Sequence, residues 1–127
     1  MKKGAIKMDN EKYNLILPVD DIGIDWEYIS LDRESTLTTL KANIKNKTSV
    51  SEKIISLNKD AILNMELSIK EIRVYLTTLS QAKFAKTFHI PLSTFSHWEQ
   101  EERTPPQYVN WMLKNIVIND FLLNPHF

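Results

Sequence analysis

Apolar residues in the second half of the chain recur at helical spacing. Intervals of three and four residues, which place side chains on one face of a helix, separate Ile69, Ile72, Leu76 and Leu79. Lys70, Glu71 and Arg73 fall on the opposite face, which we expect to be solvated. The pattern therefore predicts an amphipathic helix over about residues 69–79.

Two shorter helices are expected after it. Ser80 offers a side-chain cap for a helix over residues 81–88, whose expected buried positions are Ala82, Phe84, Ala85 and Phe88. A turn at residues 89–91 leads to a helix over residues 92–100. The positions of this third helix that are expected to face inward are Phe95 and Trp98, and those expected to face outward are Ser93, Ser96 and His97.

A fourth helix is expected after residues 103–106. The sequence there is Arg-Thr-Pro-Pro, which ends one helix and starts the next. The expected apolar stripe of this helix consists of Val109, Met112, Leu113 and Ile116. Residues 116–123 are apolar enough to form a dimer seam, and packing back onto their own domain is the equal alternative.

The first half of the chain predicts a hairpin followed by helices. Residues 13–19 form a short apolar run, residues 20–23 are typical of a turn, and residues 24–28 alternate between apolar and polar. Helices are expected over residues 34–46 and 51–66, and Asn58 marks a candidate break in the second of them.

Composition excludes several classes of protein. The chain has no cysteine and only two glycines, which excludes disulfides, thiolate metal sites and glycine-rich phosphate loops. The histidines show no spacing of metal ligands, and no nucleophile motif occurs. We therefore expect no enzyme and no cofactor or metal. No apolar run approaches the roughly 18 residues of a membrane helix, so a cytoplasmic protein without a membrane partner is expected.

Charge is polarised within the first half, although the formal net charge of the whole chain is zero. Residues 9–34 carry eight acidic side chains, and residues 41–59 carry five lysines. Such a run is usually a solvated face. The alternative is a surface that binds a basic partner by charge complementarity.

One set of residue types spans the predicted helices of the second half. Ser-Gln opens the short helix, an apolar pair lies inside it, and Trp-Glu closes the next helix. The full set is Leu79, Ser80, Gln81, Phe84, Ala85, Ile90, Pro91, Thr94, Trp98, Glu99, Arg103, Pro105, Pro106 and Tyr108. This pattern resembles the helix-turn-helix domain of the Cro and phage-repressor type, often called the XRE family, over about residues 68–118. The resemblance implies a mainly α fold, in which residues 68–127 form a four- to five-helix DNA-binding bundle and residues 1–67 a small α or α+β region.

The resemblance also implies which residues contact DNA. Two short helices held at a fixed angle let the second enter the major groove while the first crosses the phosphates. Gln81 would touch a phosphate or an adenine edge, and Thr94 lies where a phosphate or structural contact is usual. The base-reading positions hold Leu92, Ser93, Ser96 and His97, and the expected backbone clamps are Lys83, Lys86 and Arg103.

Two positions depart from the family pattern. Glycine is usual in the turn and again after the recognition helix, where this chain has His89 and Glu101. If both residues keep the left-handed conformation, each costs about 1 kcal/mol. The alternative is a different backbone at these positions.

Three functional hypotheses follow. The first is a bacterial or phage transcriptional regulator, a repressor that binds an operator in double-stranded DNA as a homodimer. The second is an antitoxin or a phage-encoded inhibitor, including the anti-CRISPR type, in which residues 1–67 bind a protein while the helix-turn-helix controls its own gene. The third is a helix-turn-helix fold that serves only in assembly.

Overall fold

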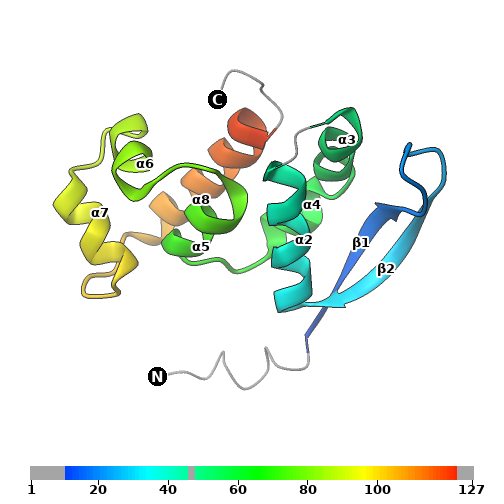
Figure 1. Cartoon of the computed structure of the whole chain (residues 1–127). Coiled ribbons are helices and arrows are strands. Elements are labelled where there is room, and N and C mark those ends of the chain that lie inside the picture. The colour runs from blue at the N-terminus through cyan, green and yellow to red at the C-terminus, as the bar shows by residue number, and fades with distance from the viewer. Residues whose placement is uncertain (1–10, 46–47, 123–127) are drawn as a thin grey trace. The chain divides into compact units, whose positions relative to one another are not determined.

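The computed structural model describes residues 11–45 and 48–122 of the chain (Figure 1). The chain divides into two compact units, residues 1–64 and residues 65–127. The described residues are mainly helical and include one small antiparallel sheet, which confirms the predicted class at this level. In chain order, the elements are β1 (Lys12–Pro18), β2 (Trp26–Asp32), α2 (Arg33–Lys45), α3 (Ser49–Leu57), α4 (Lys59–Asn64), α5 (Ile69–Leu76), α6 (Gln81–Thr87), α7 (Leu92–Glu99), α8 (Gln107–Ile116) and the π-helical segment η1 (Val117–Leu122). Residue 46 of the predicted helix and residue 123 of the predicted seam lie outside the described residues.

The predicted hairpin is confirmed. Strands β1 and β2 pair antiparallel, and Leu15 opposite Ile29 marks the centre of the register. The carboxylate of Asp20 organises the connecting turn, because it accepts hydrogen bonds from four successive backbone amides, those of Ile22, Gly23, Ile24 and Asp25. These bonds, led by the one from Asp25, lower the pKa of the Asp20 carboxyl below its usual value.

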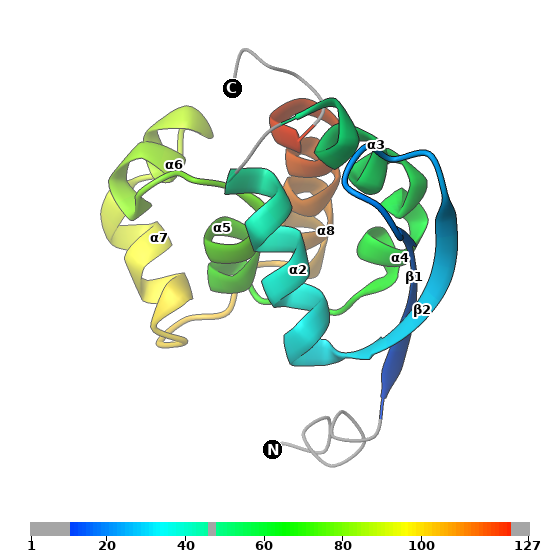
Figure 2. The ribbon, with the colours of Figure 1, turned by 45° about the vertical axis from the view of Figure 1, so that its right-hand side comes forward.

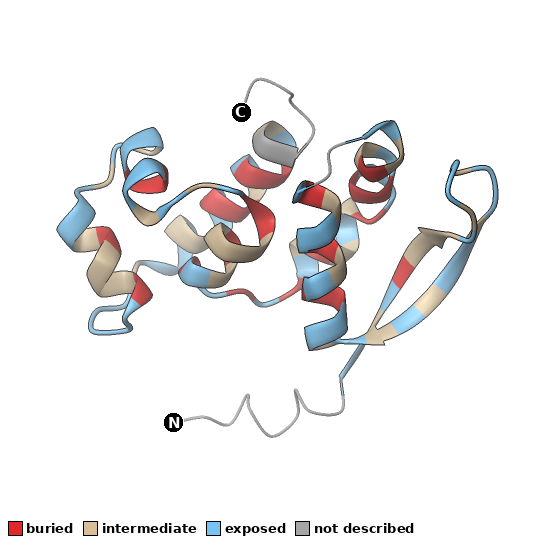
Figure 3. Cartoon of the chain, viewed as in Figure 1, coloured by how far each residue is buried: buried red, intermediate tan, exposed pale blue. Residues whose placement is uncertain are grey.

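Helices α2, α3 and α4 complete the first unit. Asp32 accepts a hydrogen bond from the backbone amide of Ser35 in the first turn of α2, and Thr48 forms a reciprocal capping box with Ser51 at the start of α3. Figure 3 shows buried positions on β1 and on all three helices. The apolar side chains buried in this unit are Leu15, Leu37, Leu40, Ile44, Ile54, Ile55 and Ile62.

The predicted break at Asn58 is confirmed, and the residue also holds the hairpin. Its amide carbonyl accepts from the backbone N–H of Ile16 at 2.6 Å, and its amide nitrogen donates to the carbonyl of Ile16 at 2.8 Å. The same nitrogen donates to the carbonyl of Ile54 at 2.7 Å, at the end of α3. Asn58 therefore occupies, on the free side of β1, the place of one residue of a neighbouring strand.

Replacement of this residue tests its role. Asn58→Ala leaves the part-buried N–H and C=O of Ile16 without the partner that Asn58 provides, so we expect the free energy of unfolding to fall by about 2 kcal/mol in chemical denaturation. Asn14→Ala, an exposed asparagine of β1, is the matched control and should change it by less than about 0.5 kcal/mol. Equal effects of the two substitutions would show that Asn58 does not anchor the strand.

The second unit is built from α5 to α8 and η1. Figures 1 and 2 show α6 and α7 side by side. Ser68 caps α5 in a reciprocal capping box with Glu71, and Ser80 caps α6 as predicted. The ring of Phe84 stacks on that of Phe95 with centroids 5.1 Å apart. Other buried apolar side chains of this unit are Met65, Leu67, Ile69, Ile72, Leu76, Ala85, Leu113, Val117 and Ile118.

Several predicted inward positions in α5, α6 and α7 are wrong. Leu79 lies beyond α5, because the chain becomes extended at Thr77, whose hydroxyl donates to the carbonyl of Arg73. Ala82 is exposed because only the side of α6 carrying Phe84 and Ala85 packs against the unit. Trp98 is half-buried rather than enclosed, with part of its ring facing a pocket.

The predicted stripe on α8 is confirmed at Leu113, which is buried, and wrong at two other positions. Met112 and Ile116 are exposed, whereas Lys114, Val117 and Ile118 are buried. On this inward face, the ammonium of Lys114 donates to the main-chain carbonyl of Met65 at 2.6 Å. Val117 and Ile118 are buried. For these two residues, this favours packing back onto their own unit rather than forming a dimer seam. Among the described residues, no helix combines the length and the apolar character needed to cross a membrane.

Candidate nucleic-acid interface

Two backbone conformations were possible in the turn between α6 and α7, and the structure has the left-handed one. His89 has φ of 58°. Its N–H bonds to the carbonyl of Lys86, and the N–H of Ile90 bonds to the carbonyl of Ala85 at 2.9 Å. These two bonds, together with the left-handed conformation of His89 after the end of the helix, define a Schellman motif. The motif satisfies the last carbonyls of α6 and reverses the chain within three residues.

The end of α7 repeats this motif. Glu101 has φ of 61° and its N–H bonds to the carbonyl of Trp98, while the N–H of Glu102 bonds to the carbonyl of His97 at 2.9 Å. Among the described residues, His89 and Glu101 are the non-glycine residues with positive φ. Both departures from the family pattern thus keep the backbone that glycine would adopt more readily.

Glycine at the first of these turns should therefore stabilise the fold. His89→Gly removes left-handed strain of about 1 kcal/mol but adds freedom to the unfolded chain, so we expect a net gain of roughly 0.5 kcal/mol and a higher Tm in thermal unfolding. Lys86→Gly, one turn earlier in ordinary helical conformation, is the control and should lower stability by about 1 kcal/mol. A lower Tm for His89→Gly would contradict the turn geometry.

A buried carboxylate joins the helices on either side of this turn. The side chain of Glu99 is 4% exposed. Arg73 of α5 binds it through two nitrogens, Nε at 2.7 Å from one carboxylate oxygen and Nη2 at 3.1 Å from the other. Gln81, the first residue of α6, donates to the same carboxylate at 2.9 Å. Glu99 therefore connects α5, α6 and α7 at one point.

The guanidinium of Arg73 also holds the connection between α5 and α6, because Nη1 donates to the carbonyl of Leu79 at 3.2 Å. Sequence periodicity placed Arg73 on the solvated face of its helix, and this prediction is wrong. The sequence contained one signal for this pair, because Glu99 is the acidic residue that closes α7 in the family-like pattern. If such an acid is buried, it requires a cation as its partner. Its partner lies 26 positions away in the chain, beyond the reach of local periodicity.

A double substitution tests this ion pair. Arg73→Met leaves the buried Glu99 carboxylate with only the Gln81 amide, and should cost about 3 kcal/mol of unfolding free energy. Adding Glu99→Leu removes the orphaned charge, so the double variant should recover to within about 1 kcal/mol of the parent. If the single and the double variants are equally destabilised in chemical denaturation, the pair is not the junction of the three helices.

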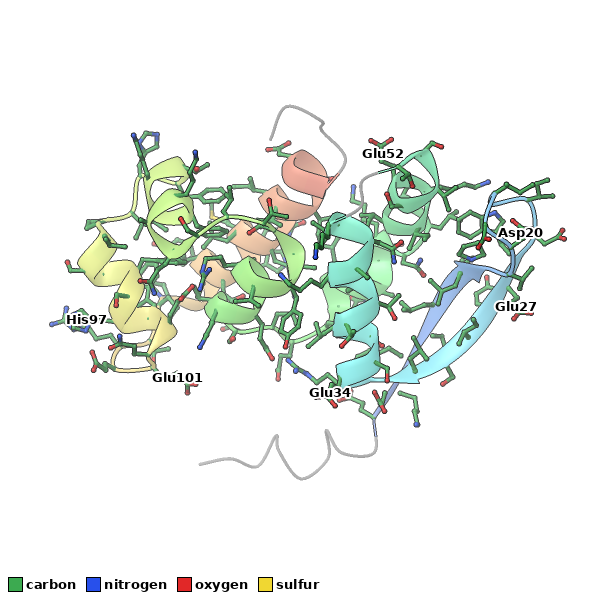
Figure 4. The ribbon with its side chains drawn as sticks, viewed as in Figure 1. Asp20, Glu27, Glu34, Glu52, His97 and Glu101 are labelled. Carbon is green, nitrogen blue, oxygen red and sulfur yellow. The ribbon has the colours of Figure 1, made fainter. Side chains whose placement is uncertain are left out.

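The predicted base-reading positions share one face of α7. Leu92, Ser93, Ser96 and His97 follow helical spacing. The first two are exposed, Leu92 by 49%, and the other two are half-buried. Figure 4 shows the imidazole of His97 pointing away from the neighbouring helices. Its Nδ1 is paired with the carboxylate of Glu102, which leaves Nε2 as the outward nitrogen.

The remaining residues predicted to contact DNA differ in their exposure and in their hydrogen bonds. Lys83 and Lys86 are exposed on α6, and Arg103 is exposed in the loop after α7; no hydrogen bond joins these three side chains to the described part of the chain. Thr94 is half-buried in the first turn of α7. Gln81 differs from the others because one N–H of its amide is occupied by Glu99. Its carbonyl oxygen and second N–H are the groups left for an external partner.

The first turn of α7 has no side-chain cap. Pro91 occupies the N-cap and provides no side-chain hydrogen bond, so the backbone amides of Leu92, Ser93 and Thr94 have no side-chain cap. Free amides at a helix start, together with the helix dipole, attract phosphate.

Comparisons with known proteins give no relative for this chain. No family model matches it, and neither a curated protein nor a solved structure does. Any inference about function therefore rests on the residues and geometry of the chain itself.

Proposed function

We propose that the second unit is a helix-turn-helix domain of the Cro and phage-repressor type, and that the protein is a transcriptional regulator that represses genes by binding double-stranded DNA as a homodimer. The observation that carries this proposal is the pair α6 and α7. A tight turn joins the two helices, one buried carboxylate binds both Arg73 and Gln81, and α7 presents an outward face of small polar side chains.

The carboxylate at the centre of this cluster belongs to Glu99. A recognition helix needs a fixed angle to its supporting helix, because a rotation of a few degrees moves its side chains out of register with the base edges. The bidentate contact from Arg73 and the amide of Gln81 supply that constraint from inside the unit. The outward face of α7 is left for DNA.

The chemistry of this outward face suits base edges in the major groove. The hydroxyls of Ser93 and Ser96 can donate or accept, and the methyl groups of Leu92 suit a thymine methyl. Nε2 of the neutral His97 ring can accept, because Nδ1 carries the proton that it donates to Glu102. Lys83, Lys86 and the open amides of α7 suit the phosphates that flank the groove. The face carries few charges, so one domain should bind with modest affinity.

A homodimer compensates for this modest affinity. Two copies of α7 would read half-sites about one helical turn, roughly 34 Å, apart in a palindromic operator. Selection of binding sites from random duplex at physiological salt tests the proposal. We expect a palindrome to be enriched, and the variant Ser93→Ala, His97→Ala to fail to select it, because it loses two base-reading groups.

The matched control for this selection is Ser56→Ala, Lys45→Ala, which removes two exposed side chains of the first unit. It should enrich the same palindrome as the parent. The proposal fails if the parent enriches no sequence, or if the α7 variant selects the parental palindrome with undiminished enrichment.

Exposed apolar side chains in the first unit favour a second candidate function, an antitoxin or phage-encoded inhibitor that binds a protein. Ile22 and Ile24, at the tip of the hairpin, are 69% and 70% exposed, and the exposed acids Asp21 and Asp25 lie beside them in the chain. Asp20 is committed to the turn, as its four backbone bonds show. The variant Ile22→Ser, Ile24→Ser should lose a protein captured by the full chain while keeping its DNA selection.

A further inference from the structure

One side of α8 exposes large apolar side chains, and these form the outer face of the helix. The side chains of the outer face, each with its exposed fraction, are Tyr108 (66%), Trp111 (61%), Met112 (47%) and Ile116 (36%). Intervals of three and four residues place them on the same side of the helix. Leu113 and Lys114 lie on the opposite side and are buried. The helix therefore uses one side for the core of its unit and leaves a second apolar side in water.

The outer face carries no charge. Lys114 is the single charged residue of α8, and it is buried on the other side of the helix. Asn115 is the polar residue beside the outer face, and its amide nitrogen donates to the carbonyl of Trp111 at 2.8 Å. Aromatic residues and methionine without neighbouring charges are typical of the buried centre of a protein–protein interface. The outer face thus has no charge that would select a partner of opposite charge.

The spacing of the outer face matches a second copy of itself. Tyr108, Met112 and Ile116 follow one another at intervals of four residues, and rows of this spacing are the ridges that pack together in helix pairs. In an antiparallel pair around a two-fold axis, Met112 meets Met112 of the second copy at the axis. Tyr108 of each copy then meets Ile116 of the other, so an aromatic ring covers an aliphatic side chain on both sides of the axis. The two helix dipoles run in opposite directions in this pair, which favours it.

The area of the outer face suits a weak dimer. A fully exposed aromatic side chain offers about 150–250 Å², so the exposed fractions of the four side chains amount to roughly 400 Å² of surface in each copy. Two copies bury roughly 800 Å² through these side chains alone, and polar residues around them bring the total toward about 1,200 Å², the lower end of stable interfaces. We therefore expect a dimer that dissociates on dilution rather than an obligate one.

We propose that the outer face of α8 is the contact between two copies of this chain, which pair their α8 helices antiparallel around a two-fold axis. The proposed function requires two copies of α7 and specifies no contact between them, and this inference supplies that contact. It rests on the proposed function only for its consequence, since the pairing itself needs no DNA. The outer face includes no residue of α7, so the base-reading side chains remain free in the dimer.

Sedimentation equilibrium of the full chain without DNA tests the pairing. We expect a reversible monomer–dimer equilibrium with a Kd on the order of 10⁻⁵ M. Met112→Glu places two like charges opposite each other at the axis, so it should weaken the dimer at least about tenfold. Leu57→Glu is the matched control, because it adds the same charge at an apolar side chain of α3 that is 42% exposed, and it should leave the Kd unchanged.

Two results of this measurement overturn the proposal. The first is a full chain that stays monomeric up to about 10⁻³ M. The second is a Met112→Glu variant whose Kd rises no more than that of Leu57→Glu, which would place the contact between copies elsewhere.

The absence of cysteine from the chain allows a test of the antiparallel arrangement. Met112→Cys should form a disulfide-linked dimer under mild oxidation, because equivalent residues meet at the axis. Tyr108→Cys and Ile116→Cys should cross-link readily when the two variants are mixed, and slowly when either is oxidised alone. Faster cross-linking of each variant with itself than with the other would show a parallel pair and overturn the arrangement.

Site selection from random duplex separates this inference from the proposed function. A chain that dimerises through α8 but enriches no sequence would overturn the proposed function and leave the pairing in place. A palindrome enriched equally by the parent and by Met112→Glu would overturn the pairing and leave the proposed function in place.

Discussion

The carboxylate of Glu99 is buried where three helices meet, and the geometry of the second unit depends on it. Its negative charge is offset by the guanidinium of Arg73, which contacts both oxygens, and by the amide of Gln81. A buried ion pair adds little net stability compared with apolar residues of the same volume, but it tolerates few alternative arrangements. We infer that this contact sets the angle between α6 and α7 rather than supplying the stability of the core.

The turns before and after α7 hold this helix in place together with the ion pair. Both end a helix in a Schellman motif, and both place a residue with a side chain in the left-handed region. Maintaining such strain requires support from the surrounding structure. Phe84 stacked on Phe95 provides that support across the α6–α7 pair. The recognition surface proposed here is thus held from within, while its outward side chains make few contacts of their own.

Local sequence signals predicted much of the fold. Hydrophobic periodicity predicted helices close to the observed α5 to α8, and alternation predicted the hairpin. Cap and turn chemistry predicted the start of α6, and Asn58 was a candidate break. The resemblance to the helix-turn-helix pattern raised a left-handed backbone at His89 and Glu101 as one of two alternatives, and the structure has it at both positions. These features depend on residues that are near one another in the chain, so a single sequence contains the information for them.

Long-range pairs of polar groups could not be predicted in the same way. Arg73 with Glu99, Lys114 with the carbonyl of Met65, and Asn58 with Ile16 each join positions far apart in the chain. Periodicity assigns a charged residue to the solvated face, and only the tertiary structure reveals its buried partner.

The most direct test of the central claim is an NMR titration of the isotope-labelled full chain with a short duplex of mixed sequence at low salt, where phosphate contacts dominate binding. The account predicts that the backbone amide signals of residues 92–97 shift most, with smaller shifts around Lys83 and Lys86. Shifts confined to the hairpin, or no shift at an excess of duplex, would contradict the assignment of α7 as the element that reads DNA.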